Sequence, residues 1–293
     1  MSMTRAIELS AGTIEYEDTG GDGPVAVLLA GLLMDSSLWR DVMAALAPEM
    51  RCIAPTLPMG AHRRPMAPDA DLSPRGLARL AGELLERLEL EDVTLVGNDT
   101  GGALVQLLAA GDDGAPRVGR IVLVSCDAFD NFPPGLTGKV IVTAGRLPAA
   151  LFGQSLRPLR LRPFRRLPLA FGWLTKRGDQ TTARWVAPVL ESRDVRRDAV
   201  RVLRGIARDR DVLLDVAEQL PRFDRPALVV WAEEDRVMPP EHGRRLTGVL
   251  PRGRLLEVDD SYTLIPLDRP LRLAEAIGEF VGVPALSPAA PAS

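Results

Sequence analysis

The sequence predicts an α/β protein built on a mostly parallel sheet with helices on both faces. Short runs of β-branched and apolar residues recur along the chain, and segments with a helical period separate the later runs. Strands that alternate with helices in this way form a parallel sheet that is covered on both sides. The eight runs are Ala6 to Leu9, Thr13 to Glu17, Val25 to Ala30, Arg51 to Ala54, Val93 to Gly97, Arg120 to Ser125, Ala227 to Ala232 and Arg254 to Val258.

Five segments with helical periodicity lie between or after these runs. They are Ser36 to Leu46, Ser73 to Leu88, Thr100 to Ala110, Pro240 to Leu250 and Arg269 to Phe280. Ser73 is expected to cap its helix, because a serine side chain accepts a hydrogen bond from the first turn and Pro74 suits the first helical position.

The alternation of strands and helices stops in the middle of the chain. Between Asp127 and Leu220 the sequence predicts short helices broken by six prolines: Pro133, Pro134, Pro148, Pro158, Pro163 and Pro168. An insertion that leaves a sheet and returns to it covers the carboxyl ends of the strands, where ligands bind. We therefore expect a core of residues 1–126 and 221–282, a helical cap of residues 127–220, and a disordered tail over 283–293.

The composition favours an ordinary globular protein. With 293 residues, 46% hydrophobic content and a net charge of -3, the chain can bury a large core and lacks the basic surplus of nucleic-acid-binding proteins. No apolar run is long enough to span a membrane, and the first residues lack a signal peptide's apolar segment. We expect a cytoplasmic monomer or homodimer with no nucleic-acid partner.

Cysteine and histidine are too few to suggest metal chemistry. Cys52 and Cys126 fall within strand-like runs, so buried reduced thiols are expected. His62 and His242 are the only histidines. The sequence therefore predicts neither a metal site nor a cofactor.

The segment from Leu95 to Gly102 carries the strongest chemical signal. Gly97, Asp99 and Gly101 reproduce the frame of a G-x-S-x-G nucleophile elbow with aspartate in place of serine. A carboxylate attacks carbon without a base to deprotonate it. The motif therefore favours chemistry through an alkyl-ester intermediate on Asp99.

Together with three further segments, this elbow makes the sequence resemble the α/β-hydrolase fold, in the branch of haloalkane dehalogenases and epoxide hydrolases that use an aspartate nucleophile. The segments are Ala30 to Leu33 with Ser36 to Arg40, Thr56 to Gly60, and Val229 to Pro240. The resemblance covers roughly Ile7 to Val281. It implies a mostly parallel eight-stranded sheet flanked by helices, with the helical cap inserted after the sixth strand.

The resemblance also implies roles for particular residues. Asp99 is the expected nucleophile, Asp235 the triad acid and Asp127 an alternative acid, whereas Thr263 stands where the family has its catalytic histidine. Backbone N–H groups of Thr100 and of the loop containing Leu32 and Leu33 are expected to form the oxyanion hole. The family's halide-binding asparagine and tryptophan are absent from these positions, and neither tyrosine lies in the cap.

Three other residues are expected near the substrate, which should be a small, mainly apolar molecule. His62 lies in a loop that borders the pocket in this fold, Tyr262 precedes Thr263, and Phe129 is one of five cap phenylalanines. An apolar cap makes an apolar pocket.

Three hypotheses follow from the missing histidine. Hydrolysis could use a substitute base, namely Asp127, Asp235 or His62. Converging aspartates could instead share protons in an isomerase, cyclase or lyase, because burial and like charge raise carboxylate pKa values. The third hypothesis is a non-catalytic protein that binds small molecules.

Arginines form a further pattern in the cap. Arg157, Arg160, Arg162, Arg165 and Arg166 alternate with leucine and proline. We expect a solvated face whose arginine stems cover apolar atoms. The alternative is a surface that contacts an anionic carrier or a membrane.

Overall fold

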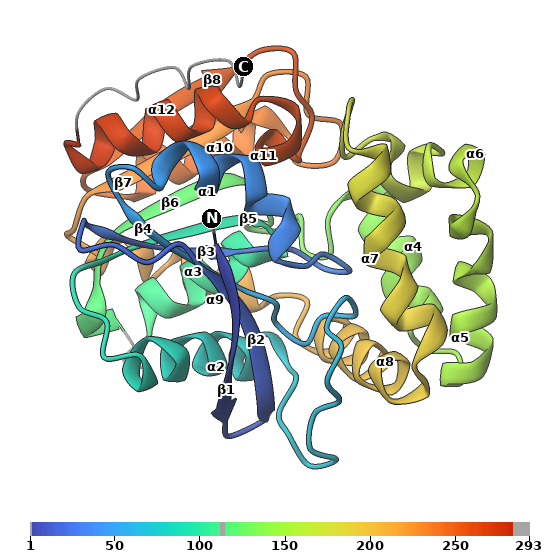
Figure 1. Cartoon of the computed structure of the whole chain (residues 1–293). Helices are drawn as coiled ribbons and strands as arrows, with labels where there is room; N and C mark the ends of the chain where they lie inside the picture. Colours follow the sequence, from blue (N-terminus) through green and yellow to red (C-terminus); the bar gives the residue numbers. More distant parts are fainter. Residues whose placement is uncertain (1, 112–114, 284–293) are drawn as a thin grey trace, which may run out of the picture.

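A computed structural model of the chain describes residues 2–111 and 115–283. Its centre is an eight-stranded sheet with strand order β1-β2-β4-β3-β5-β6-β7-β8 (Figure 1). β1 and β2 pair antiparallel, as do β2 and β4, and the remaining pairs are parallel. The predicted fold class is confirmed. The strands are Met3–Leu9, Gly12–Asp18, Val25–Leu29, Arg51–Pro55, Val93–Asp99, Val118–Cys126, Ala227–Ala232 and Gly253–Val258.

Helices cover both faces of this sheet. Figure 1 shows α1 and α12 on one side and α2 and α3 on the other. The bounds are α1 Arg40–Leu46, α2 Pro74–Arg87, α3 Thr100–Ala110, α10 Pro240–Val249, α11 Ile265–Asp268 and α12 Pro270–Val281. The hydroxyl of Ser73 accepts a hydrogen bond from the N–H of Gly76 at 3.1 Å, which confirms the predicted cap of α2.

The first predicted helix differs from the structure. Residues Ser36–Trp39 form a 3-10 turn, and α1 begins only at Arg40. The carboxylate of Asp35 accepts hydrogen bonds from the N–H of Ser37 and from the indole N–H of Trp185, which holds this turn in place. The periodicity of residues 36–46 predicts one continuous helix. The local hydrogen bonds of the Asp35 side chain interrupt that helix.

The cap leaves the sheet after β6 and returns at β7. Its helices form a separate layer beside the ends of the strands (Figure 1). They are α4 Gly135–Ala144, α5 Ala149–Leu156, α6 Arg162–Arg165, α7 Asp179–Glu191 and α8 Arg193–Arg208, with short turns η3 Arg157–Arg160 and η4 Pro168–Gly172. The segment ends with α9 Val212–Ala217 and η5 Leu220–Arg222, which lie outside this layer. α9 and η5 contact α3, so the end of the predicted insertion lies against the core.

The two cysteines are buried and unpaired. Burial raises the pKa of the Cys52 thiol to about 12 and that of Cys126 well above its ordinary value. Among the described residues, no group of three or more histidine, cysteine or acidic side chains is placed to hold a metal ion. Within the same residues, no helix is both long and apolar enough to cross a membrane. The tail predicted as disordered lies, from residue 284 onward, outside the described residues.

Candidate active site

Asp99 stands at a sharp turn between the end of β5 and the start of α3. Its backbone has φ 56° and ψ -131°, a strained conformation for any residue other than glycine. The neighbouring glycines make the turn possible. A Cβ atom on Gly97 would lie 2.4 Å from the carbonyl oxygen of Gly101, and one on Gly101 would lie 2.2 Å from that of Leu29. The elbow geometry predicted from the sequence is therefore present.

Three donors hold one oxygen of the Asp99 carboxylate. Oδ1 accepts hydrogen bonds from the N–H of Thr100 at 2.7 Å, from its hydroxyl at 3.1 Å and from the N–H of Leu32 at 3.3 Å. The N–H of Leu33 instead donates to the carbonyl of Met59 at 3.0 Å. Within residues 2–111 and 115–283 no hydrogen bond reaches Oδ2 of Asp99. The three donors on Oδ1 thus fix the orientation of the carboxylate.

A cavity of about 280 Å³ lies beside this carboxylate, between the core and the cap. Leu32, Leu33, Asp99 and Thr100 line it from the core side. The cap supplies mainly apolar side chains, among them Phe132, Ile141, Leu156, Phe171 and Leu174. The sequence analysis missed the α4 residues, although Thr137, Ile141 and Ala144 follow a helical spacing that marks one face. The cavity suits a small apolar molecule.

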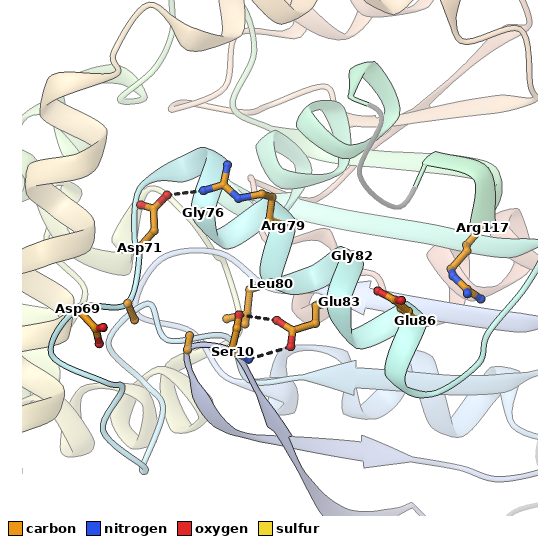
Figure 2. A pocket seen from close by; sticks show the side chains of 12 residues that line it. Ser10, Asp69, Asp71, Gly76, Arg79, Leu80, Gly82, Glu83, Glu86 and Arg117 are labelled. Atoms are coloured by element: carbon orange, nitrogen blue, oxygen red, sulfur yellow. Dashed lines mark hydrogen bonds and ion pairs between the residues drawn. The ribbon is translucent and has the colours of Figure 1, made fainter.

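A larger hollow lies next to α2, away from Asp99. It has a volume of about 590 Å³, and its lining is polar and charged (Figure 2). Glu83 accepts hydrogen bonds from the backbone N–H and the hydroxyl of Ser10, and Arg79 contacts Asp71. Glu83 is thus held by Ser10 and Arg79 by Asp71, and we assign this hollow no chemistry.

Asp127 lies directly behind the elbow. Its N–H donates to the carbonyl of Asp99 at 3.4 Å, and its side chain is fully buried. Neither carboxylate oxygen has a hydrogen-bond partner among the described residues. Loss of solvent, together with the charge of Asp99, raises the pKa of Asp127 well above its ordinary value. Burial also raises the pKa of Asp99. Burial thus favours the neutral form more strongly at Asp127 than at Asp99.

Asp235 and Thr263 form a second pair. The Thr263 hydroxyl donates to Oδ1 of Asp235 at 2.8 Å, and the N–H groups of Val237 and Met238 donate to the same oxygen at 2.9 and 2.8 Å. Burial raises the pKa of Asp235 to about 6 in spite of these donors. A threonine hydroxyl thus partners the acid, and it cannot act as a base near neutral pH.

His62 is buried behind the cavity wall and does not line the cavity. Its Nδ1 accepts the N–H of Gly60 at 3.2 Å, and its Nε2 lies 3.5 Å from Oδ2 of Asp198 on α8. Asp198 also accepts the N–H of Met66 at 2.8 Å. These contacts tie the loop after β4 to the cap.

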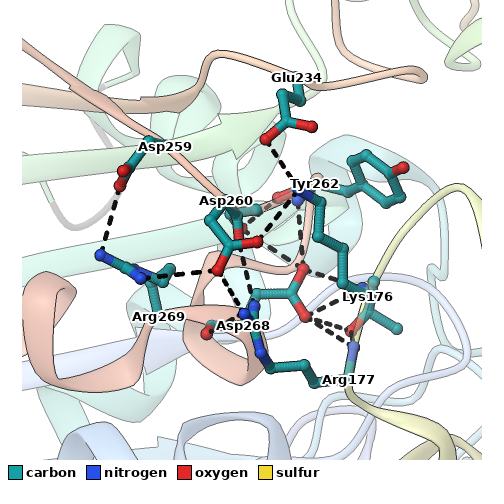
Figure 3. A network of polar contacts seen from close by, with 10 residues as sticks. Lys176, Arg177, Glu234, Asp259, Asp260, Tyr262, Asp268 and Arg269 are labelled. Atoms are coloured by element: carbon teal, nitrogen blue, oxygen red, sulfur yellow. Dashed lines mark hydrogen bonds and ion pairs between the residues drawn. The ribbon is translucent and has the colours of Figure 1, made fainter.

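Tyr262 and Phe129 are also absent from the cavity lining. Cations lie over both rings: Lys176 and Arg236 are 5.0 and 4.7 Å from the ring centre of Tyr262, and Arg245 is 3.8 Å from that of Phe129. Figure 3 shows Tyr262 beside a network of ion pairs that joins the cap to the core. Both aromatic residues therefore pack against charged groups.

Comparisons with known proteins agree with this geometry. The model of the alpha/beta hydrolase family matches residues 26–276. Haloalkane dehalogenase 2 of Mycobacterium tuberculosis (strain ATCC 25618 / H37Rv) is 27% identical over 285 residues, which is 95% of each chain. An uncharacterized hydrolase of Bacillus subtilis (strain 168) is 41% identical over 64 residues, 22% of this chain and 23% of the relative.

Among solved structures, the epoxide hydrolase CorEH without ligand superposes with a TM-score of 0.74 at 19% identity, over 96% of this chain and 99% of that one. At this identity the likeness shows the fold alone. The family model, however, spans most of the chain from β3 to α12. With the sheet order and the elbow already established, the protein is a member of the alpha/beta hydrolase family.

Proposed function

We propose that this hydrolase-family protein acts on a small, mainly apolar molecule through nucleophilic attack by Asp99. The observation that carries the proposal is the Asp99 carboxylate itself, with Oδ1 fixed by three donors and the whole group facing an apolar cavity. The relative named as a haloalkane dehalogenase supports a substrate with an electrophilic carbon.

In the proposed first step, Oδ2 of Asp99 attacks that carbon. A carbon–oxygen bond forms while the bond to the halogen or epoxide oxygen breaks, and that atom takes the electron pair. Halide then leaves, whereas the epoxide oxygen stays bonded to the neighbouring carbon and takes a proton from solvent. The donors on Oδ1 keep the attacking carboxylate oriented. The product of this step is an alkyl ester on Asp99.

Release of the ester requires a water molecule that loses a proton. The Thr263 hydroxyl cannot accept that proton, and neutral Asp127 cannot accept it either. Asp235 is ionised above its pKa of about 6, but it does not line the cavity beside Asp99. We therefore expect ester formation to be much faster than its hydrolysis.

Intact-mass spectrometry of the protein with 1-bromobutane and 1,2-epoxyhexane tests this proposal. Wild type should gain one butyl group from the bromide or one hydroxyhexyl group from the epoxide at Asp99, and Asp99→Asn should gain neither. Thr263→His places an imidazole beside Asp235 and should shorten the lifetime of the adduct at least about tenfold. The rate of adduct formation should rise with pH, because only the ionised form of Asp99 attacks and burial raises its pKa.

An adduct that survives Asp99→Asn would contradict the proposal, as would the absence of both adduct and turnover across an enlarged panel of haloalkanes and epoxides. Peptide mapping locates the modified residue. Asp130→Asn is the matched control. It changes an exposed aspartate shortly after β6 and should react like wild type.

A second function is favoured by one observation, the neutral acid Asp127 next to Asp99. Two carboxyl groups with separated pKa values can shuttle a proton, as an isomerase, cyclase or lyase requires. Turnover without an adduct, abolished by Asp99→Asn and by Asp127→Asn alike, would support this function over the first.

A further inference from the structure

Exposed apolar side chains concentrate on the cap. Eleven large apolar side chains are exposed among the described residues, and eight of them lie within residues 136–169. They include Phe164, Leu167 and Leu169, which are 43%, 50% and 46% exposed. Single exposed apolar residues are ordinary, but a cluster marks an interaction surface. We call the exposed side chains of residues 135–172 the cap outer surface.

The elements that carry these side chains lie side by side. The hydroxyl of Thr137 on α4 donates to the carbonyl of Pro168 in η4 at 3.3 Å. α5 contacts η3, η3 contacts α6, and α6 contacts η4. Figure 1 shows α5 and α6 at the margin of the cap on the side away from the sheet. The apolar side chains therefore belong to one connected surface.

This surface is also strongly basic. Residues 131–178 contain nine lysines and arginines and neither aspartate nor glutamate, although the whole chain has a net charge of -3. The exposed residues Lys139, Arg146, Arg157 and Arg160 have no ion-pair partner in the part of the chain that the structure describes. Elsewhere, exposed arginines such as Arg40 and Arg244 pair with a neighbouring acid. Arg162 and Arg165 pair with Asp179, so the uncompensated positive charge of the cap outer surface lies at Lys139, Arg146, Arg157 and Arg160.

The cavity beside Asp99 reaches this surface. Val140 and Leu169 line the cavity and are 43% and 46% exposed. The same two side chains thus belong to the cavity wall and to the cap outer surface.

The positive charge and the exposed apolar side chains of this surface together indicate what kind of partner it binds. Exposed leucines and a phenylalanine do not suit the phosphate backbone of a nucleic acid, and a second copy of the same basic surface would be repelled. An anionic bilayer matches both properties. Its headgroups pair with arginine, while leucine and phenylalanine enter the boundary between headgroups and acyl chains. α4 and α5, with 10 and 8 residues, fit a surface contact of this kind.

We propose that the cap outer surface docks on an anionic phospholipid bilayer and that the cavity opens toward the lipid. The docking proposal depends only on the exposed apolar side chains and on the positive charge of this surface. Delivery of an apolar substrate from the bilayer to Asp99 rests in addition on the function proposed above, and it identifies the substrate class as molecules that partition into membranes.

Co-sedimentation of the full chain with vesicles tests docking. We expect binding to phosphatidylcholine vesicles that contain about 40% phosphatidylglycerol at low salt, weaker binding in 0.5 M salt, and no binding to phosphatidylcholine alone. The double variant Arg157→Glu/Arg160→Glu should lower the partition coefficient at least about twentyfold, since each cation near the surface contributes roughly a factor of five. Arg222→Glu/Arg254→Glu is the control, because both arginines are exposed outside the cap outer surface and change the net charge equally.

A second pair of variants separates apolar insertion from charge. Phe164→Ser/Leu167→Ser should lower binding at least about tenfold at constant charge, whereas Leu271→Ser, at a 65% exposed position on α12, should bind like wild type. Asp99→Asn should also bind like wild type, so a failure of the Asp99 chemistry leaves this test intact.

Three outcomes would overturn the proposal. The first is wild type that stays in the supernatant with anionic vesicles at low salt. The second is an equal loss of binding in the two arginine double variants, which indicates only net charge. The third is a dimer by analytical ultracentrifugation that Phe164→Ser/Leu167→Ser dissociates without any vesicle binding, because a second copy then covers this surface.

Discussion

Asp127 is buried, and no hydrogen bond to its carboxylate oxygens is found within residues 2–111 and 115–283. Such a group loses its hydration on folding, so the charged form is strongly disfavoured. The nearby charge of Asp99 adds to this effect. A residue that retains a proton under these conditions lowers the stability of the fold at neutral pH, where an unfolded aspartate would ionise freely.

We predict that Asp127→Asn stabilises the protein at pH 8 but not at pH 4. Below about pH 3.9 the aspartate is protonated in both states, so the substitution changes little. As the pH rises, only the unfolded chain releases this proton, which lowers the free energy of unfolding of wild type. The melting temperature of the variant should exceed that of wild type at pH 8 by at least about 2 °C.

Thermal denaturation monitored by circular dichroism between pH 4 and pH 8 measures this difference. Asp130→Asn, at an exposed position, should leave the melting temperature nearly unchanged throughout. A difference for Asp127→Asn that does not depend on pH would refute the account of a buried neutral acid.

The sequence predicts the contacts of Asp99 with its neighbours better than it predicts contacts between residues that are far apart in the chain. Asp99, Thr100 and Leu32 meet because the elbow and the loop after β3 are fixed by strand order. The surroundings of His62 depend on Asp198, which lies in the cap and far along the chain. Periodicity and motifs carry no information about such a pair, so the placement of His62 required the structure.

At the level of elements, the junction of β5 and α3 depends on close backbone contact. A side chain on Gly97 would collide with the carbonyl of Gly101 and the N–H of Gly102, both of which belong to the first turn of α3. Backbone atoms cannot move aside as a flexible side chain can. The turn that presents Asp99 therefore tolerates only glycine at this position.

We predict that Gly97→Ala lowers the free energy of unfolding by about 1–3 kcal/mol or more, because its Cβ overpacks this junction. Gly248→Ala should instead raise it by up to about 1 kcal/mol, since Gly248 lies in α10 with no atom within 4 Å of the added Cβ. Denaturant unfolding measures both values. Equal effects of the two substitutions would contradict the crowding argument.

Most elements follow from the pattern of the sequence, and the exceptions have physical causes. β7 and α3 have the predicted bounds, because apolar runs and caps define them locally. α11, Ile265–Asp268, was not predicted, since four residues are too few for a periodic signal. The break before α1 depends on Asp35, whose hydrogen bond to Trp185 joins segments that are distant in sequence.

At the scale of the whole molecule, Asp268 fastens the cap to the core (Figure 3). This buried carboxylate accepts hydrogen bonds from the Thr175 hydroxyl at 2.7 Å and from the N–H groups of Lys176 and Arg177 at 3.0 Å, all of which lie in the cap. It also accepts the N–H of Tyr262 at 3.1 Å. One side chain therefore ties the end of η4 and the start of α7 to the loop after β8.

We predict that Asp268→Ala loosens this attachment. The buried N–H groups lose a charged acceptor, which should lower the free energy of unfolding by on the order of 3 kcal/mol. Limited trypsin digestion should cut at Lys176 or Arg177 at least about tenfold faster than in wild type. Asp259→Ala removes an exposed partner of Arg269 and serves as the control, and an equal increase in that variant would refute the role of Asp268.

The surface of the cap could not be derived from the order of its residues. The arginines between Arg157 and Arg166 were interpreted as a solvated face, with a membrane or anionic carrier as the alternative. Which leucines remain exposed depends on how the short helices pack, and prolines make that packing irregular. In the structure Arg157, Arg160, Arg162 and Arg166 are exposed as predicted, whereas Arg165 is buried, and contact with a membrane stays a proposal.

The burial of both sulfur atoms has a chemical consequence for the proposed reaction of Asp99 with alkylating compounds. Thiolates react with such compounds far more readily than carboxylates do, yet Cys52 and Cys126 are protonated at neutral pH and screened from solvent. Alkylation of the protein's own cysteines is thereby suppressed. Chemoselectivity toward oxygen then results from the architecture as well as from the reactive group, and the chain can persist among electrophiles that would inactivate an exposed thiol.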